Sequence, residues 1–555
     1  MLTNSLATKT QSSTLKKKIS SQPKKFSWSR VWHICQTWAN QHEWLFLLWL
    51  LVIVLRLPSL SEPYWYGDEA IYLTIGNALK FGQRLYLEIV DHKTPLIYYF
   101  ASVPNQLWFR LLMSVWMLAS SYFFWRLANK LFPSLKVALF SSVLFVFLSN
   151  VSFMEGNIPN GELFVIGFVL AGLHFLSRTT FFNNWLLAEN RSITSKDLWM
   201  SFVAGLMFGG GVMTKVPGLF DAIAGASIFA WLILPGLWLL ISRRSFRTPP
   251  LKQTILGGLI FTTGLVAPLV LFIIYYWLRG SLPAFLEFGL LYNFHYTGNW
   301  TVPIDNIWLS TQFELLNKGL WLVFGFLLTT YLSFKRSVDR KLIWLSWWSW
   351  LALFAALLSN RPYPHYFLQL VPPLSLLAAA WLFTKSDWYS RLVASLPILF
   401  SAAALILLQF KLYPFVDYYH QYLKLVTGQI SQTEYHQQFN SLVGQNEVVA
   451  QAIIDNSFSN DRLFVWGTNP MLYALTKRVP ASKFTVAFHI HDLYAYQNVL
   501  QEVKLAKPSH IVVMKNETSW PDLNEYLGEH YLRSVETEDM ILYRRSTLTS
   551  LMLIQ

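Results

Sequence analysis

Ionisable side chains are scarce in this chain, and those that could do chemistry occur in polar segments between long apolar runs. Carboxylates can take a proton from an attacking hydroxyl, and lysine and arginine make strong charge-assisted bonds to phosphate. Both kinds occur among the candidates, which are Asp68, Glu69, Asp91, His92, Lys93, Glu162, Lys215, Arg361, His365 and Tyr366. This combination is typical of sites that take a proton from one group and stabilise the negative charge of another.

Each candidate also has a purely structural interpretation. Asp68 and Glu69 could cap the helix that follows them, because Asp is a good N-cap residue. Asp91 and Lys93 could form a surface ion pair worth less than about 1 kcal/mol. Glu162 could be a solvated helix start. Lys215 and Arg361 could extend to the lipid headgroups, and His365 and Tyr366 could belong to an aromatic belt at the membrane surface. The functional interpretation therefore depends on these side chains lying together.

The elements that must position these residues follow from composition. Of the 555 residues 54% are apolar and only 13% charged, whereas soluble domains carry about 25% charged residues. The chain therefore belongs to the membrane class. Its net charge of +14 comes from basic residues in short loops, which favours membrane orientation over nucleic-acid binding. The single cysteine, Cys35, excludes an intramolecular disulfide and a cysteine-based metal site.

Apolar helical runs predict about eleven membrane spans. They cover residues 44–57, 108–127, 136–150, 161–177, 198–213, 217–241, 254–278, 319–334, 341–358, 364–384 and 391–410. Alternate loops are basic, which places the N-terminus in the cytoplasm by the positive-inside rule. Residues 95–107 are apolar but too short to span, and we treat them as a partial or re-entrant segment. If they crossed the membrane, the charge pattern would be inverted.

Three domains are predicted. Residues 1–43 form a basic cytoplasmic tail, and residues 44–410 form an all-α polytopic membrane domain. An odd number of spans leaves residues 411–555 on the extracytoplasmic side. This last region mixes strand-like runs at 463–466, 510–514 and 540–543 with a helical run at 493–504, so we expect a small α/β domain there. The protein is expected in the plasma membrane, with its site on the outer face.

With these residues in view, the chain resembles the GT-C membrane glycosyltransferases, in particular the branch of the protein O-mannosyltransferases and the lipid A aminoarabinose transferases. Gly67–Tyr72 and then Asp91–Tyr99 look like the first extracytoplasmic loop of this family, where an acidic pair precedes a lysine-proline-leucine-tyrosine segment. Asn160–Phe164 is similar to its second acidic motif, and Arg361–Gln369 to the start of a late span. Thr94 stands where many members have a second proline.

The resemblance implies an inverting transfer of sugar from a polyprenyl-phosphate carrier to an acceptor hydroxyl. Asp68 would be the general base, and Glu162 and Glu69 would orient the acceptor. The residues that would bind the carrier phosphate and the sugar are Asp91, His92, Lys93, Lys215, Arg361, His365 and Tyr366. A divalent cation, Mg²⁺ or Mn²⁺, would suit the oxygens of Asp68 and Glu162. The implied partners are the lipid-linked sugar, the bilayer, and a protein, lipid or cell-wall glycan acceptor.

Two other functions compete with this one. A transporter or flippase for lipid-linked glycans would also have many spans and a basic groove, but transporters tend to place ionisable residues near the midplane between repeats. A structural membrane subunit would instead dock a partner through residues 411–555. Release of sugar from polyprenyl-phosphate donors by the purified protein would separate the three functions.

Overall fold

The computed structural model describes residues 43–189, 191–241, 251–298, 310–312, 314–335, 338–359 and 361–546. The predicted basic tail, with Cys35, and the basic loop around Arg243 lie outside the described residues. The following paragraphs concern the compact unit Leu47–Gln555, together with the described residues that begin α2. Each predicted apolar run forms a helix in the structure. These helices are α2 (Glu43–Arg56), α5 (Gln106–Leu131), α6 (Leu135–Leu148), α7 (Gly161–Ser177), α9 (Ser195–Val212), α10 (Gly218–Ile241), α11 (Leu251–Leu278), α15 (Leu315–Lys335), α16 (Arg340–Leu357), α17 (Val371–Phe383) and α18 (Trp388–Leu407).

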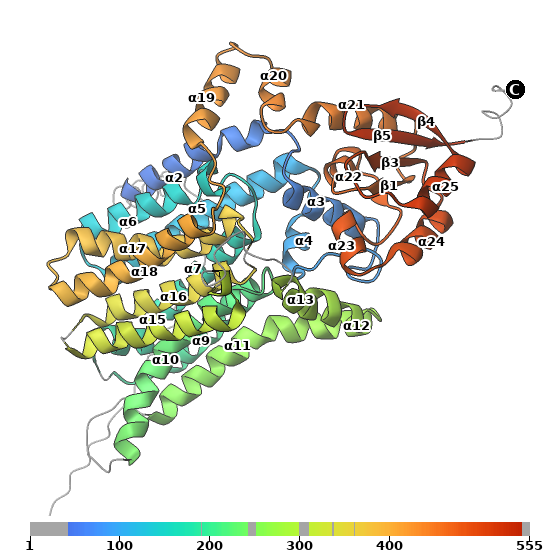
Figure 1. The fold of residues 1–555 in the computed structure, drawn as a ribbon. Coiled ribbons are helices and arrows are strands. Elements are labelled where there is room, and N and C mark those ends of the chain that lie inside the picture. The colour runs from blue at the N-terminus through green and yellow to red at the C-terminus, as the bar shows by residue number, and fades with distance from the viewer. Residues whose placement is uncertain are drawn as a thin grey trace, which may run out of the picture. The chain divides into compact units, whose positions relative to one another are not determined.

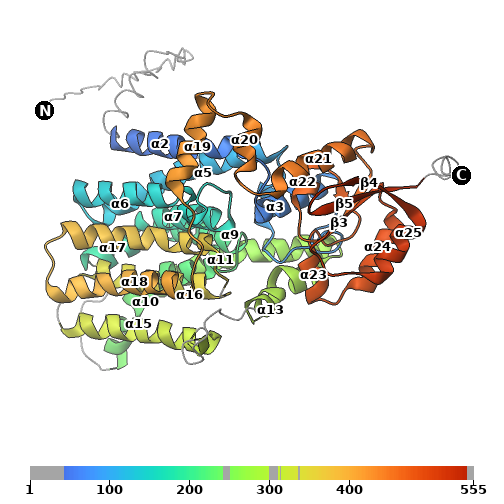
Figure 2. The same cartoon turned by 45° about the horizontal axis from the view of Figure 1, so that its top comes forward.

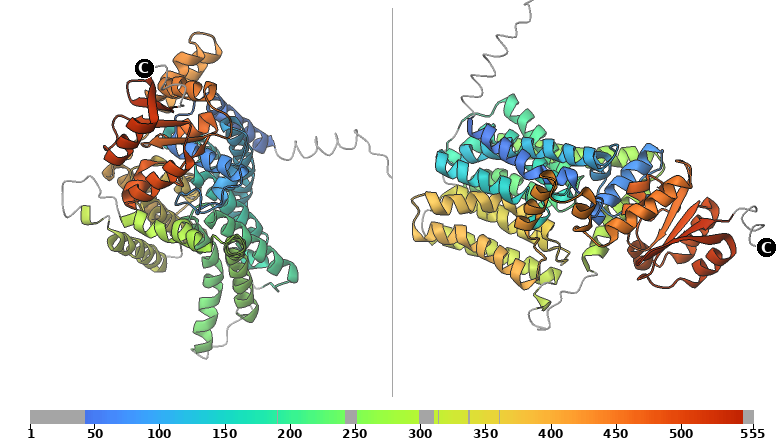
Figure 3. Two further views of the ribbon diagram at one scale, coloured as in Figure 1. Left: turned by 90° about the vertical axis from the view of Figure 1, so that its right-hand side faces the viewer. Right: turned by 90° about the horizontal axis from the view of Figure 1, so that it is seen from above.

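Six of the described helices are long and apolar enough to cross a membrane, or seven if the bent pair α7 and α8 (Thr180–Leu187) counts as one span. These helices make the chain a membrane protein, whereas the predicted count of eleven spans is not confirmed. Helices α15 to α18 pack against one another and run side by side in Figures 1 and 2. Figure 3 shows α10 and α11, drawn in green, extending together beyond the other helices.

Two irregular segments interrupt the helices where the candidate residues occur. The first loop, residues 57–105, contains η1 (Pro58–Ser61), α3 (Gly67–Lys80) and the five-residue α4 (Leu96–Phe100). At about 1.5 Å per residue α4 is far too short to cross a bilayer, as expected for residues 95–107. The second loop, residues 149–160, contains only the short η2 (Ser152–Met154). These two loops lie between the apolar helices and carry several of the ionisable candidate residues.

Basic residues from separate loops meet at one place. Arg126, Lys130, Arg178 and Lys196 line a single cavity of about 380 Å³, together with His174 and Asn183. Two of the loops that the charge pattern assigns to the cytoplasmic side therefore do lie on the same side of the helices. That this side faces the cytoplasm stays a prediction.

Residues 411–546 form a helical connector and a small sheet domain. The connector contains α19 (Phe415–Val426) and α20 (Gln432–Gln437). The strands are β1 (Arg462–Trp466), β2 (Val479–Pro480), β3 (His510–Met514), β4 (Tyr531–Glu536) and β5 (Met540–Arg545). They form a sheet in the order β2-β1-β3-β5-β4, parallel from β2 to β3 and antiparallel beyond.

The helices of this domain are α21 (Leu442–Asp455), α22 (Met471–Thr476), α23 (Ala487–Asp492), α24 (Tyr496–Ala506) and α25 (Pro521–His530). One core joins Val449 and Ile453 of α21 to Val465 and Val512 of the sheet. The predicted α/β character is confirmed, and the three predicted strands correspond to β1, β3 and β5.

The sheet domain contacts the first loop through backbone atoms. The N–H of Val90 donates to the carbonyl of Lys483 at 2.8 Å, and Val90 pairs with Phe484 as an isolated parallel bridge. Asn77 Nδ2 on α3 also donates to the carbonyl of Lys477 at 3.0 Å. The first loop is therefore held by a domain that lies almost four hundred residues further along the chain.

Candidate active site

Asp68 lies in the first turn of α3 but does not cap it. The helix begins at Gly67, the N-cap position is Tyr66, and no side chain makes a capping bond there. The Asp68 carboxylate instead accepts a hydrogen bond from Tyr72 Oη, with Oδ2 at 3.1 Å, and Oδ2 lies 3.4 Å from Lys93 Nζ. Its side chain keeps 30% of its surface exposed. The capping interpretation of Asp68 therefore fails, and its carboxylate remains open to an incoming molecule.

The charge state of Asp68 follows from its surroundings. Burial alone would raise the pKa of this carboxyl. The positive charge of Lys93, with contributions from His365 and Lys215, outweighs burial and holds the pKa of Asp68 below its usual value. Asp68 is therefore an unprotonated carboxylate near neutral pH, which is the state a general base requires.

Lys93 is a buried cation held between two carboxylates. Its side chain is only 7% exposed, and Nζ lies 3.4 Å from Asp68 Oδ2 and 3.6 Å from Asp91 Oδ2. Burial would lower the pKa of Lys93, but Asp68 and Asp91 raise it above its usual value. Tyr98 fixes this arrangement, because its Oη donates to Asp91 Oδ2 at 2.7 Å and accepts from the Lys93 N–H at 3.1 Å. Lys93 is thus charged and held in one place.

A second lysine–carboxylate pair comes from α7 and from the turn after α9. Glu162 in the first turn of α7 forms an ion pair with Lys215. A side chain at Gly161 would lie 3.3 Å from Lys215 Cδ, so the glycine leaves space for the lysine. Lys215 Nζ also lies 4.5 Å from the centre of the Tyr366 ring, within cation–π range. Glu162 Oε2 is buried and makes no hydrogen bond within the described residues, so it can still accept one.

His365 joins this group through an acid that the sequence analysis missed. Glu155, at the end of η2, has φ 59°, a left-handed conformation that costs a non-glycine residue about 1–3 kcal/mol. Its carboxylate pairs with His365 Nδ1 and accepts a hydrogen bond from Tyr66 Oη at 2.6 Å. Tyr66 directly precedes α3, so the second loop is tied to the helix that carries Asp68.

An aromatic ring connects two further candidates, His92 and Arg361. The Tyr296 ring, on α13 (Tyr292–Gly298), stacks on His92 with ring centres 4.3 Å apart. The Arg361 guanidinium also contacts this ring, 3.9 Å from its centre. Arg361 and His92 therefore lie near each other although they come from distant loops.

Glu69 faces away from this group. Its carboxylate forms an ion pair with Arg110 on α5, at 2.6 Å, and accepts from Gln106 Nε2 at 3.0 Å. Glu62 forms a second ion pair with Arg110, at 3.1 Å. Successive residues of a helix point about 100° apart, which explains why Asp68 and Glu69 lie in different surroundings. The structure thus brings nine of the ten predicted residues into one connected set and separates Glu69 from it.

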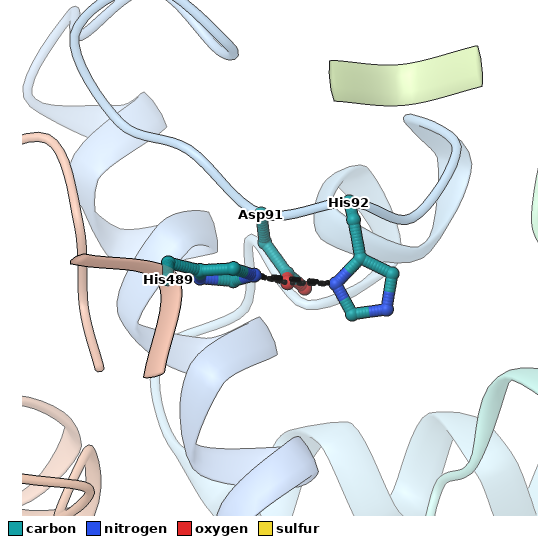
Figure 4. A group of neighbouring side chains, drawn as sticks. All are labelled: Asp91, His92 and His489. Atoms are coloured by element: carbon teal, nitrogen blue, oxygen red, sulfur yellow. Dashed lines mark hydrogen bonds and ion pairs between the residues drawn. The ribbon is translucent and has the colours of Figure 1, made fainter. Parts of the chain in front are cut away.

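Three side chains could hold a metal ion. Asp91, His92 and His489 are all buried, and their ligand atoms lie within 4.8 Å of one another. Figure 4 shows His489 of α23 and His92 approaching Asp91 from opposite sides. Asp68 and Glu162, the predicted ligands of Mg²⁺ or Mn²⁺, are each paired with a lysine instead, and metal binding by these two acids stays a prediction.

Three residues of this region were missed by the sequence analysis for identifiable reasons. Glu155 lies seven residues before Glu162 in a segment already recognised as polar, so it could have been found as a second acid of that loop. His489 belongs to a His-Ile-His sequence in a domain that contains no other catalytic pattern. Tyr296 follows a run of aromatic residues that looks like any interfacial segment, and nothing in its sequence marks it.

The sequence matches no known protein family and no curated protein. Among solved structures it is similar to the archaeal oligosaccharyltransferase AglB from Archaeoglobus fulgidus, solved with an inhibitory peptide and a dolichol-phosphate, at 13% identity over 88% of this chain and 70% of that chain, with a TM-score of 0.39. The apo form of the Archaeoglobus fulgidus enzyme is 13% identical over 85% of this chain and 69% of that chain, with a TM-score of 0.40. The complex of that enzyme with Zn and sulfate is 13% identical over 85% of this chain and 68% of that chain, with a TM-score of 0.38. Likeness of this size leaves the function to be argued from the side chains.

Proposed function

We propose that this protein is an inverting glycosyltransferase that moves a sugar from a polyprenyl-phosphate carrier to an acceptor hydroxyl at the outer face of the membrane. The observation that carries the proposal is the contact between a partly exposed carboxylate, Asp68, and a buried lysine, Lys93, at 3.4 Å. A base and a phosphate-binding cation side by side are what such a transfer needs. The resemblance of the acidic and lysine-proline motifs to the GT-C enzymes supports the same reaction.

The proposed reaction is a single displacement. The acceptor oxygen attacks the anomeric carbon of the sugar while the bond from that carbon to the phosphate oxygen breaks. Asp68 takes the proton of the acceptor hydroxyl, a form of assistance worth about 10²–10⁴-fold in rate. The polyprenyl phosphate leaves with the electron pair of the broken bond, and the acceptor becomes glycosylated with inverted configuration.

The cations of the site have a matching role. Lys93 and Lys215 would meet the departing phosphate, whose negative charge increases as the bond breaks, and such stabilisation is often the largest contribution to catalysis. Arg361, stacked on Tyr296 at 3.9 Å, would bind the same phosphate or the sugar. Glu162 would orient the acceptor through Oε2, the oxygen that makes no hydrogen bond within the described residues.

The experiment is a donor assay in defined lipid. Purified protein in nanodiscs is supplied with radiolabelled polyprenyl-phosphate sugars, and release of sugar and of polyprenyl phosphate is measured. We expect release that depends on Asp68 and persists in Glu88→Gln, since Glu88 is a partly exposed acid of the same loop that pairs with Arg84. Movement of intact lipid-linked sugar across liposome membranes without release would instead identify a transporter and overturn the proposal.

A further inference from the structure

The group formed by Asp91, His92 and His489 has the dimensions of a transition-metal site. His92 Nδ1 lies 3.0 Å from Asp91 Oδ1, His489 Nε2 lies 3.6 Å from the same oxygen, and the two nitrogens are 3.4 Å apart. A tetrahedral ion with bonds of about 2.0–2.2 Å holds its ligand atoms about 3.3–3.6 Å apart. The two sides of the triangle that meet at His489 Nε2 fall in this range, and the third side, from His92 Nδ1 to Asp91 Oδ1, is shorter at 3.0 Å (Figure 4).

Hydrogen bonding alone does not explain this triangle. Asp91 Oδ1 is buried and pairs with His92 Nδ1 at 3.0 Å, and His489 Nε2 lies 3.6 Å from the same oxygen. A proton on His92 Nδ1 would satisfy this oxygen but would do nothing for the His489 ring, whose Nδ1 has no hydrogen-bond partner within the described residues. A buried polar group of this kind requires an explanation. A cation placed between the three atoms would satisfy the oxygen and both nitrogens at once.

The surroundings orient all three side chains toward the same point. Asp91 uses its other oxygen, Oδ2, to accept from Tyr98 at 2.7 Å, so Oδ1 is left facing the histidines. The His92 ring is held by stacking on Tyr296 at 4.3 Å. His489 Nδ1 has no hydrogen-bond partner within the described residues, so the ring can carry its proton there and present the Nε2 lone pair. The hydrogen bond from Tyr98 to Asp91 is a supporting contact of the kind that is typical of metal ligands.

We propose that Asp91, His92 and His489 bind one divalent transition-metal ion of the zinc type. Two imidazoles and one carboxylate form a ligand set that suits Zn²⁺ and its neighbours, whereas Mg²⁺ and Mn²⁺ prefer oxygen. Three protein ligands leave a fourth position for water. The site differs in ligands and in metal class from the Mg²⁺ or Mn²⁺ site expected at Asp68 and Glu162.

The ion would connect two parts of the chain. Asp91 and His92 belong to the first loop, whereas His489 belongs to α23 of the sheet domain. The backbone bridge between Val90 and Phe484 already joins these parts beside the site. A metal ion here therefore fastens the sheet domain to the loop that carries Lys93. This proposal stands independently of the proposed reaction, because bound metal and stability are measured without any sugar donor.

The test uses the full chain in detergent, stripped with a chelator and dialysed against ZnCl₂ or MgCl₂. We expect about one tightly bound zinc per chain by elemental analysis, no retained magnesium, and a higher melting temperature with zinc than without it. Cobalt in place of zinc should give the intense visible bands of a tetrahedral site. Absence of bound zinc in the wild-type protein would overturn the proposal.

Two variants and one matched control complete the test. His489→Gln and Asp91→Asn should each weaken zinc binding at least about a hundredfold, since even groups that only support a ligand cost about 10–100-fold. The control is His491→Gln on the same helix, where His491 pairs with Glu517 at 3.0 Å. It should keep full zinc binding. Full zinc retention by His489→Gln would overturn the proposal, and the wild-type cobalt spectrum decides the matter if both variants fail to fold.

Discussion

Lys93 Nζ and Asp68 Oδ2 meet at 3.4 Å across the first loop. A lysine that contacts the proposed base keeps that base ionised, yet the same lysine is placed to bind the phosphate of the donor. Because one ammonium group cannot pair fully with both anions, binding of the phosphate would weaken the ion pair between Lys93 and Asp68. The carboxylate would then become more basic at the moment when a proton has to be accepted.

Asp68→Asn should lower turnover by about 10²–10⁴-fold, the usual value of general-base assistance. The amide keeps the size of the side chain and can still pair with Tyr72, so expression and donor binding should stay nearly normal. Turnover and donor affinity are measured on the purified variant, with Glu88→Gln as the control. Near-normal turnover would exclude Asp68 as the base and would direct attention to Glu162.

Lys93→Met should raise the KM for the lipid donor. A charge-assisted hydrogen bond to a phosphate is worth about 1.5–3 kcal/mol, which corresponds to roughly a ten- to hundredfold weaker interaction. The exposed Lys80→Met at the end of α3 is the control, because that lysine bonds only the carbonyl of Val103 among the described residues. A well-folded Lys93→Met protein with unchanged donor kinetics would remove Lys93 from the phosphate site.

The same substitution should move the acidic limb of the pH–rate profile. The pKa of Asp68 is held below its usual value mainly by Lys93, against the effect of burial. A base with a lowered pKa stays unprotonated as the pH falls, and activity is lost only when the pH drops below that pKa. Without Lys93, burial raises the pKa, so the activity of Lys93→Met should be lost at a higher pH than that of the wild type. Identical acidic limbs in both proteins would show that Lys93 does not control the base.

Glu69→Gln should affect stability rather than the reaction. Glu69 and Arg110 are each 1% exposed and form an ion pair at 2.6 Å, and breaking a buried pair costs about 3–5 kcal/mol. We expect a clear fall in melting temperature in detergent, with near-normal turnover per folded molecule. A fully stable Glu69→Gln protein with lost turnover would place Glu69 among the reacting groups.

Membrane topology can be tested with single cysteines in a Cys35→Ser background. Lys385→Cys lies in the loop between α17 and α18, which the charge pattern places in the cytoplasm, and Ser459→Cys is exposed in the sheet domain. In intact cells an impermeant thiol reagent should label only Ser459→Cys, while both should react after lysis. Labelling of Lys385→Cys alone would reverse the predicted orientation.

Long apolar runs predicted the positions of the helices well, because a helix that crosses a bilayer must be apolar along most of its length. They did not settle how many helices cross the membrane, since Ser195–Val212 and Arg340–Leu357 form helices without meeting the span criteria. Residue type selected Asp68, Lys93, Glu162 and Lys215 as candidates, and the structure places them in two lysine–carboxylate pairs, while their roles stay predictions. Residue type could not separate Asp68 from Glu69, because the distinction depends on where Arg110 lies in three dimensions.

The bond between the N–H of Val90 and the carbonyl of Lys483 has a consequence for biosynthesis. Ribosomes add about 5–20 residues per second, so Val90 emerges roughly 20–80 s before Lys483. During that interval the spans can insert, but Asp91, His92 and Lys93 lack their final neighbours. The first loop therefore reaches its mature geometry only at the end of translation. A nascent chain that stops before Lys483 would be embedded in the membrane yet remain without an assembled site.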